Sequence, residues 1–255
     1  MIFDLSARHD PCDLRQYYDD NGYVIVRNLI DSTKLSAILR ALDEYKKAGY
    51  PYYSQAIHNW ISPEIDSHGY MQDSMENFTR LYLSCGLAAA GNNILLSQEV
   101  LDVLGLINPG FRYFSLWQNM LFDRSTGTVD HQDSWYLDTW PKGNLLAAWF
   151  ALEDMADGCG PFHVYPGSHL KVDPEAMATL SHEDFVAKCS RIASSFQARP
   201  AMLEKGSVLF WHPWTLHGAS RQTDPGKSRK SLTAHYFPIG VARASGGHPA
   251  PSCAV

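Results

Sequence analysis

The sequence places a histidine and an aspartate two positions apart, His131 and Asp133, in a pattern that can bind a metal ion. If residues 129–135 form a strand, the two side chains point to the same side and can converge on one ion. An imidazole and a carboxylate are two of the three ligands in the facial triad that holds non-haem Fe(II) and leaves positions open for reactants. The third ligand must then come from elsewhere in the chain.

Two later histidines are candidates for this third ligand. His217 follows a strand-like run, Val208–Trp211, and a turn. The chain between Asp133 and His217 is long enough for several strands to bring it back to the same place. His212 stands at the end of the same run, beside Pro213, where it can simply end the strand. We favour His217 and keep His212 as the alternative.

A cationic group begins the next predicted strand. Arg229 and Ser231 share one face of that strand, whereas Lys230 points away. The planar guanidinium of Arg229 suits a carboxylate, and the hydroxyl of Ser231 adds a hydrogen-bond donor. The pattern therefore favours a dicarboxylate that binds the metal at one end and this pair at the other. The alternative is that Arg229 only caps a hairpin.

The elements that must position these residues change in type along the chain. The first part, about residues 1–110, favours helices. Residues 111–240 favour short strands separated by turns. Residues 241–255 are rich in Gly, Ala, Ser and Pro, which is typical of a flexible tail. We predict a single α+β, mainly β domain over residues 1–255, with N-terminal helices packed outside a β-sandwich or barrel.

Periodicity and turn signals give the limits of these elements. Asp31 and Ser32 offer an N-cap for one helix. A charged stretch, Asp173–Ser195, predicts a helical insertion over one rim. The other predicted helices are Leu14–Asp20, Lys34–Lys47, Ser74–Ala90 and Ser97–Leu106, and the predicted strands are Tyr23–Val26, Arg112–Phe122, Asn144–Leu152, Phe162–Tyr165, Ser207–Trp211 and Ser231–Phe237.

Composition excludes several classes of function. The chain has 255 residues, 45% hydrophobic and 19% charged, which is typical of an ordered globular protein. The net charge is −6 and no basic block is present, so the sequence does not indicate binding to nucleic acid. No apolar run is long enough to span a membrane. The five cysteines are scattered without a Cys-x-x-Cys pattern, so we expect free thiols and a cytoplasmic location.

Four motifs follow one another along the chain: His131-x-Asp133, the segment Gly158–His169, the segment His217–Ser220, and Arg229. Their order resembles the phytanoyl-CoA dioxygenase (PhyH) family, which comprises Fe(II)- and 2-oxoglutarate-dependent oxygenases. Residues 21–26 also resemble the N-terminal strand of the family, so the resemblance spans about residues 14–238. It implies a double-stranded β-helix (jelly-roll, cupin-like) core, iron bound by His131, Asp133 and His217, and 2-oxoglutarate held by Arg229.

The resemblance also implies a reaction. Fe(II), 2-oxoglutarate and O2 would hydroxylate an unactivated C–H bond of a small molecule and release succinate and CO2. Because Asp133 is present, whereas related halogenases lack this carboxylate and bind chloride, we expect hydroxylation and not chlorination. Gln118 and Asn119 on the preceding strand are candidates to hydrogen-bond the cosubstrate. Trp135 and Tyr136 are candidates to line a substrate pocket.

Three other functions stay open on the sequence alone. A metal-dependent enzyme of the same fold need not use 2-oxoglutarate. A degenerate site would leave a non-catalytic small-molecule-binding module, although the complete set of candidate ligands speaks against it. A nucleophilic hydrolase would need Ser168 and His169 as nucleophile and base, but no Gly-x-Ser-x-Gly motif surrounds Ser168. The acidic net charge and the aromatic residues favour a partly apolar small molecule over a CoA ester as the substrate.

Overall fold

Most of the β-structure lies in one large sheet in the computed structural model, which describes residues 2–4, 11–82, 84–245 and 248–249. Its strands are β1 (Ile2–Asp4), β2 (Tyr23–Arg27), β3 (Tyr52–Ser54), β4 (Asn59–Ile61), β5 (Met75–Glu76), β6 (Phe114–Phe122), β9 (Leu146–Ala151), β12 (Val208–Trp211) and β14 (Ser231–Pro238). Within the described residues their order is β1-β2-β12-β9-β14-β6-β5-β3-β4. The β1–β2 pair is parallel and the others are antiparallel.

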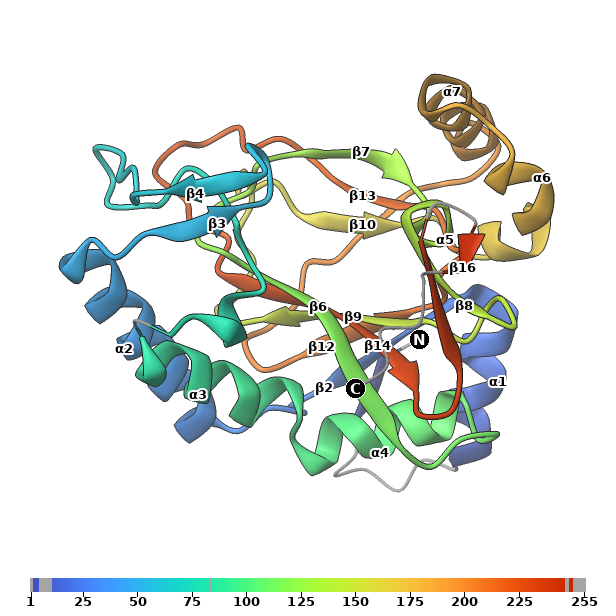
Figure 1. The fold of residues 1–255 in the computed structure, drawn as a ribbon, viewed down its shortest axis with the longest axis horizontal. Helices are drawn as coiled ribbons and strands as arrows, with labels where there is room; N and C mark the ends of the chain where they lie inside the picture. Colours follow the sequence, from blue (N-terminus) through green and yellow to red (C-terminus); the bar gives the residue numbers. More distant parts are fainter. Residues whose placement is uncertain (1, 5–10, 83, 246–247, 250–255) are drawn as a thin grey trace.

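A smaller antiparallel sheet faces the large one (Figure 1). Its strands are β7 (Thr128–His131), β10 (Phe162–Val164), β11 (Arg199–Pro200) and β13 (His217–Ala219), and their order in the described chain is β11-β10-β13-β7. Apolar side chains from both sheets meet between them, and Trp149 of β9 stacks on Phe162 of β10 with ring centroids 5.7 Å apart. Two sheets packed in this way form the predicted jelly-roll core.

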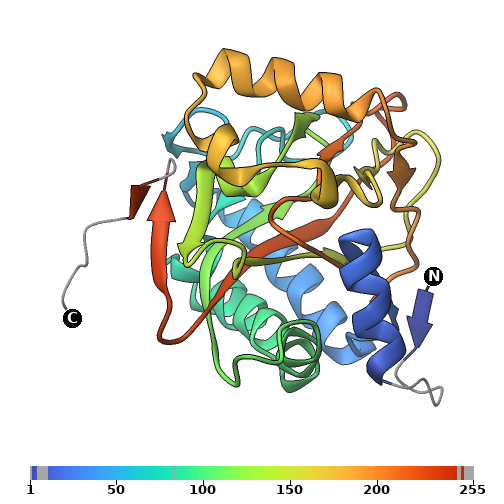
Figure 2. The ribbon, with the colours of Figure 1, turned by 90° about the vertical axis from the view of Figure 1, so that its right-hand side faces the viewer.

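Helices cover the outer face of the large sheet (Figures 1 and 2). They are α1 (Pro11–Asn21), α2 (Ser32–Ala48), α3 (Cys85–Leu95) and α4 (Gln98–Ile107). Fully buried Ile38 and Leu42 of α2 share one apolar cluster with Phe210 and Leu232 of the sheet. As predicted, α2 begins after Asp31, whose carboxylate accepts hydrogen bonds from the first amides of the helix. No helix in the described residues is long and apolar enough to cross a membrane.

The predicted insertion over residues 173–195 is helical and packs over the smaller sheet (Figure 2). Phe185 and Cys189 of α7 share a buried cluster with Tyr165 and Leu216 from the segments beside β10 and β13. The remaining elements are α5 (Asp133–Tyr136), α6 (Pro174–Ala178), α7 (His182–Ala193), the 3₁₀ helices η1 (Phe78–Arg80) and η2 (Ser168–Lys171), and the strands β8 (Leu137–Trp140), β15 (Ala242–Ser245) and β16 (His248–Pro249).

Two predictions of local structure are wrong. The predicted helix Ser74–Ala90 is divided into β5, η1 and the first part of α3. Met75 pairs with Leu121 in the large sheet, and Asn77 has a left-handed φ of 50°, which stops any helix there. The predicted flexible tail, 241–255, includes β15, which pairs with β8; its residues 246–247 and 250–255 lie outside the described residues.

Candidate active site

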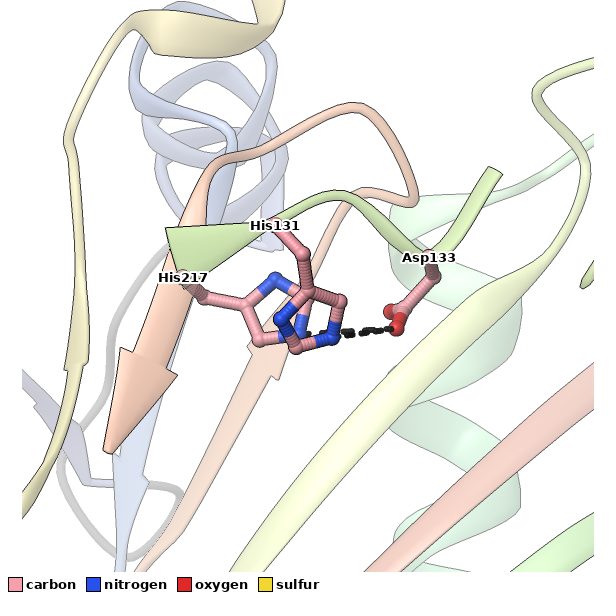
Figure 3. Close-up of side chains that lie close together, drawn as sticks. All are labelled: His131, Asp133 and His217. Carbon is pink, nitrogen blue, oxygen red and sulfur yellow. Dashed lines mark ion pairs between the residues drawn. The ribbon is translucent and has the colours of Figure 1, made fainter. Parts of the chain in front are cut away.

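The two candidate histidines and the aspartate converge between the sheets (Figure 3). His131 ends β7, Asp133 begins α5 and His217 begins β13. One ligand atom from each residue lies within 4.8 Å of the other two. Asp133 Oδ1 is 3.4 Å from His217 Nε2 and 3.8 Å from His131 Nε2. Two imidazoles and one carboxylate on one side of a point form the donor set that suits non-haem Fe(II).

His131 and Asp133 do not converge for the predicted reason. The strand ends at His131, and Asp133 is the first residue of a short helix, so the two side chains meet across a turn and not along one face of a strand. The side chain of the intervening Gln132 donates to the Trp214 carbonyl, and the Ser134 amide donates to the Pro213 carbonyl at 3.2 Å. These bonds tie the turn to the segment that precedes His217.

Hydrogen bonds behind the cluster orient its side chains. The Nδ1 atoms of His131 and His217 lie 2.8 and 3.0 Å from the carbonyls of Val129 and Thr215. A carbonyl can only accept, so each Nδ1 carries a proton, and the Nε2 of each ring faces the common centre, where it can bind a metal ion. The indole of Trp211 donates to Asp133 Oδ2 at 2.8 Å, which leaves Oδ1 toward the histidines.

Burial and neighbouring charges set the protonation states. Burial alone would raise the pKa of Asp133, but His217 and His235 outweigh it and hold that pKa well below its usual range. Burial, reinforced by His217, lowers the pKa of His131 to about 4. Burial would also lower the pKa of His217, but Asp133 outweighs it and raises that pKa. Near pH 7 Asp133 is a carboxylate and His131 a neutral imidazole, the forms that bind metal ions.

A small inner cavity of about 80 Å³ is lined by both this cluster and Arg229. Arg229 is 2% exposed, and its Nη1 donates to the Gly160 carbonyl at 3.3 Å while its guanidinium lies 5.1 Å from the Phe122 ring. Its Nε has no hydrogen-bond partner in the described residues. Burial lowers the pKa of Arg229 to about 10, so it stays charged near neutral pH. A buried guanidinium with spare donors is suited to a carboxylate ligand.

An outer cavity of about 870 Å³ shares its floor with the inner one. His131, Asp133 and His235 line both cavities. Of the aromatic residues at its wall, Trp60 is 57% exposed and Tyr82 95% exposed. The aromatic side chains of the lining are Tyr53, Trp60, Tyr82 and Tyr136, and the polar ones beyond the floor include Gln55, His58, Glu76, Asn77, Arg80 and Gln118.

Of the residues predicted to contact the cosubstrate besides Arg229, one lines a cavity and two do not. Gln118 lines the outer cavity, where it donates to Glu76 at 3.0 Å. Asn119 lines neither cavity, and its side chain instead bonds Thr79. Ser231 also lines neither, because its hydroxyl donates to the Arg229 carbonyl at 3.3 Å. Thr233, two residues further along the same face of β14, lines the inner cavity in its place.

Of the two aromatic residues predicted to line a substrate pocket, only one lines a cavity. Tyr136 lines the outer cavity, and its ring meets that of His131 edge-on at 5.7 Å. The Tyr136 hydroxyl lies 2.9 Å from Nε2 of His182 on α7. Trp135 lines neither cavity; it stacks on Phe185 with centroids 4.9 Å apart and belongs to the packing of α7.

The alternative residues lie away from the cluster. The ring of His212 packs against Tyr18 and His169, with centroids 6.3 and 5.6 Å apart, and neither of those residues lines the cavities. The Ser168 hydroxyl accepts from the Leu216 amide at 2.9 Å. The His169 Nε2 lies 2.9 Å from the Asp19 carbonyl, so Ser168 and His169 do not form a nucleophile–base pair.

Sequence reasoning missed His235. This residue follows Thr233 at an alternate position of β14, and this period of two was the available signal that both face the site. His235 is 3% exposed, and its Nε2 lies 3.3 Å from Asp133 Oδ1.

Two solved structures with 2-oxoglutarate (alpha ketoglutarate) in their sites share this fold. The epimerase SnoN in complex with Fe3+, alpha ketoglutarate and nogalamycin RO aligns with 96% of this chain and 91% of its own, at a TM-score of 0.69 and 18% identity. EctD from S. alaskensis with 2-oxoglutarate and 5-hydroxyectoine aligns with 96% of this chain and 84% of its own, at a TM-score of 0.66 and 15% identity. The jelly-roll core of this chain carries a His-Asp-His cluster, the donor set of the class of non-haem Fe(II) proteins.

Sequence comparison identifies the family within this class. The family described as Phytanoyl-CoA dioxygenase (PhyH) matches residues 18–231. The peroxisomal phytanoyl-CoA dioxygenase of Homo sapiens is 28% identical over 241 residues, which cover 87% of this chain and 67% of that protein. Phytanoyl-CoA dioxygenase domain-containing protein 1 of Danio rerio is 28% identical over 147 residues, 54% of this chain and 48% of that protein. The chain belongs to the phytanoyl-CoA dioxygenase family and is a 2-oxoglutarate-dependent dioxygenase that uses Fe(II) and O2.

Proposed function

We propose that His131, Asp133 and His217 hold Fe(II), that Arg229 holds the far carboxylate of 2-oxoglutarate, and that a small molecule in the outer cavity is hydroxylated. One observation carries this proposal. Ligand atoms from three distant positions lie within 4.8 Å of one another, beside a buried guanidinium without an ionic partner in the described chain. The donor set fits the metal because it leaves coordination positions open for reactants.

Fe(II) and 2-oxoglutarate, when bound, supply the O2 activation that ends in succinate, CO2 and an oxidised substrate. The residues of the chain bind, orient and exclude water. The carbonyls of Val129 and Thr215 keep the Nε2 atoms of both histidines toward the centre. Trp211 holds Asp133 through its second oxygen. Asp133 and His217 are 5% and 3% exposed, which keeps bulk water from that side of the centre.

The presence of Asp133 favours hydroxylation over chlorination. A carboxylate at this position fills the place that chloride takes in related halogenases. The Asp133 carboxylate is also held by Trp211, so it is not free to leave the centre. Incubation with chloride and substrate, followed by mass spectrometry, tests this assignment, and a chlorinated main product would contradict it.

We further propose a bulky, ring-bearing substrate of low charge. The outer cavity of about 870 Å³ is in the range of pockets for drug-sized ligands, about 300–1,000 Å³. Exposed Trp60 and Tyr82 at its wall offer stacking surfaces. Among the described residues, Arg80 is the one lysine or arginine of the lining, which also includes Glu76, whereas the phosphates of a CoA ester need several cations. SnoN is named with nogalamycin and EctD with 5-hydroxyectoine, which are small molecules without CoA.

A reducing compartment such as the cytoplasm suits the cysteines. Cys159 and Cys189 are buried free thiols. The human relative is named as peroxisomal. Expression of the tagged chain in its own cells, followed by fractionation, tests the compartment, and recovery with a secreted or peroxisomal fraction would contradict the cytoplasm.

The decisive experiment is anaerobic reconstitution with Fe(II) and 2-oxoglutarate, followed by a screen for succinate release in air. The screen compares ring-bearing metabolites with long-chain acyl-CoA esters, and Asp133→Ala is the control. We expect ring-bearing compounds to trigger succinate release by the wild type alone. Absence of metal-dependent 2-oxoglutarate binding would contradict the assigned residues. Release triggered only by acyl-CoA would contradict the substrate class. Oxidation without 2-oxoglutarate would favour the alternative metal-dependent enzyme.

A further inference from the structure

We infer that His235 is a second anchor for 2-oxoglutarate, donating a hydrogen bond from Nε2 to the carboxylate that lies beside the metal. This inference rests on the proposed function, in which Arg229 holds the opposite carboxylate. It assigns a role to a residue of β14 that is not one of the three metal ligands.

The first observation is that His235 is buried without hydrogen bonds. Its side chain is 3% exposed, and neither ring nitrogen has a hydrogen-bond partner in the described residues. His131 and His217 differ, because the Nδ1 of each is bonded to a backbone carbonyl. Buried polar atoms in folded proteins are nearly always paired, so an unpaired ring aimed into a cavity indicates a missing partner.

The second observation is the place of the ring. His235 lines both the inner cavity that it shares with Arg229 and the outer cavity. Its Nε2 lies 3.3 Å from Asp133 Oδ1 without the alignment of a hydrogen bond. Among the described residues, however, the set of mutually close ligand atoms comprises only those of His131, Asp133 and His217. His235 therefore reaches the carboxylate from outside the cluster, where a ligand bound beside the metal would lie.

The third observation is an irregularity in the sheet at this point. β14 pairs with β6 through His235 and Gln118, but the next pair joins Tyr236 to Leu116, so Trp117 is an extra residue on β6. Such bulges occur next to active sites, where they redirect a side chain. The bulge lies beside His235, where the register shifts before regular pairing resumes at Tyr236.

The chemistry of the cavity selects the partner. 2-Oxoglutarate carries two carboxylates, and Arg229 can satisfy one of them. The other carboxylate needs a donor near Asp133, and an N–H at Nε2 of His235 supplies it. Thr233 of β14 lies between Arg229 and His235 in the sequence and adds a hydroxyl to the same cavity wall. β14 and the residues just before it would thus present donors along the length of the dicarboxylate.

The test compares His235→Leu and His235→Gln with the wild type under anaerobic conditions. The Gln variant keeps an N–H donor near the position of Nε2, whereas the Leu variant keeps only the volume. Binding of 2-oxoglutarate to the Fe(II)-loaded protein is measured by calorimetry and by the charge-transfer absorption of the complex. We expect the Leu variant to raise the 2-oxoglutarate Kd roughly 10- to 100-fold and the Gln variant to recover part of it.

A second ligand separates an anchoring role from a general structural one. 4-Oxopentanoate keeps the ketone and the far carboxylate of 2-oxoglutarate but has a methyl group in place of the carboxylate beside the metal. We expect His235→Leu to leave the Kd of 4-oxopentanoate unchanged. Phe237→Leu is the control on the same strand, because Phe237 lines neither cavity and packs on Trp117. It should leave both affinities unchanged.

Three results would overturn the inference. The first is an unchanged 2-oxoglutarate Kd in His235→Leu. The second is an equal loss of affinity for 2-oxoglutarate and 4-oxopentanoate. The third is a loss of Fe(II) affinity in the absence of either ligand, which would make His235 a support for Asp133 only. If the Leu variant does not fold, the comparison of Gln with His235→Asn, whose amide falls short of Nε2, decides in the same way. Failure of the wild type to bind 2-oxoglutarate at all would instead contradict the proposed function.

Discussion

Replacement of Arg229 by methionine should stabilise the ligand-free protein and abolish tight 2-oxoglutarate binding. Methionine keeps the unbranched, apolar part of the side chain and removes the charged guanidinium. Arg229 is 2% exposed, with one hydrogen bond to the Gly160 carbonyl and a contact with the Phe122 ring. A buried charge without an ionic partner lowers the stability of the ligand-free protein. The cost is offset only when a carboxylate ligand binds to the guanidinium.

The magnitude follows from the pKa of this residue. Burial lowers the pKa of Arg229 from 12.5 to about 10, which at about 1.4 kcal/mol per pH unit disfavours the buried charge by about 3 kcal/mol. Loss of the bond to Gly160 and of the contact with Phe122 offsets about 1–2 kcal/mol of this gain. We expect a net gain of about 1–2 kcal/mol, which raises Tm by about 2–8 °C in a chain of this size. Arg229 is protonated in both the folded and unfolded states at pH 7, so this gain does not depend on pH near neutrality.

The affinity for 2-oxoglutarate should change in the opposite direction. Removal of one partner of a buried charge pair costs about 2–5 kcal/mol, so the Kd should rise at least about 30-fold. Thermal unfolding of the metal-free protein and anaerobic calorimetry of the Fe(II)-loaded protein measure the two effects. In the wild type, 2-oxoglutarate should raise Tm, and in the variant it should not.

The neighbouring lysine is the matched control. Lys230 Nζ lies 3.5 Å from Asp123 and 3.5 Å from Glu153, and Asp123 is 1% exposed. Lys230→Met should therefore destabilise the protein by about 1–3 kcal/mol and leave 2-oxoglutarate binding unchanged. An Arg229→Met variant that binds 2-oxoglutarate as the wild type does would refute the assignment of this anchor. A large loss of stability in that variant would refute the view that Arg229 lacks a partner within the chain.

Three further predictions concern the ligands, a glycine and pH. Asp133→Ala and His217→Ala should retain no Fe(II) after anaerobic desalting; metal analysis checks this, and iron retained by both variants would exclude them as ligands. Gly160→Ala should lose about 1–3 kcal/mol in denaturant unfolding, because its φ is +76° and a Cβ there would lie 2.5 Å from the Ser220 carbonyl oxygen; unchanged stability would contradict this close contact. Burial lowers the pKa of His212 to about 3, so the unfolded chain takes up the proton first as pH falls below about 6.5 and stability drops by about 2 kcal/mol from pH 7 to pH 5. His212→Asn should remove that part of the slope, and a slope equal to that of the wild type would rule out His212 as its source.

Elements with strong local signals could be predicted from the sequence. Asp31 caps α2, and Gly49 ends it with a φ of +66°. β12 covers Val208–Trp211, close to the predicted 207–211. The prediction failed over residues 74–90, because pairing of Met75 with Leu121 and the left-handed φ of Asn77 override the helix propensity of the segment. The assignment of residues 1–255 to one domain stays a prediction.

In the site, too, the residue types could be predicted from the sequence, whereas the contacts between them could not. Residue type alone pointed to His131 and Asp133, but the turn that joins them depends on bonds to Pro213 and Trp214, which no local pattern contains. The choice of His217 over His212 follows from strand pairing, since His217 lies opposite His131 in the smaller sheet. Pairing between strands from distant parts of the chain is a tertiary property.

The sequence by itself determined which chemical groups are available and, through the order of its motifs, the family to which the chain belongs. Only the tertiary structure decided which groups meet. It buried Arg229 without an ionic partner in the described chain, turned Asn119 away from the site, and brought His235 to 3.3 Å from Asp133. The physical reason is that spacing along the chain encodes the direction of neighbouring side chains, whereas contact and burial depend on how remote strands pair and pack.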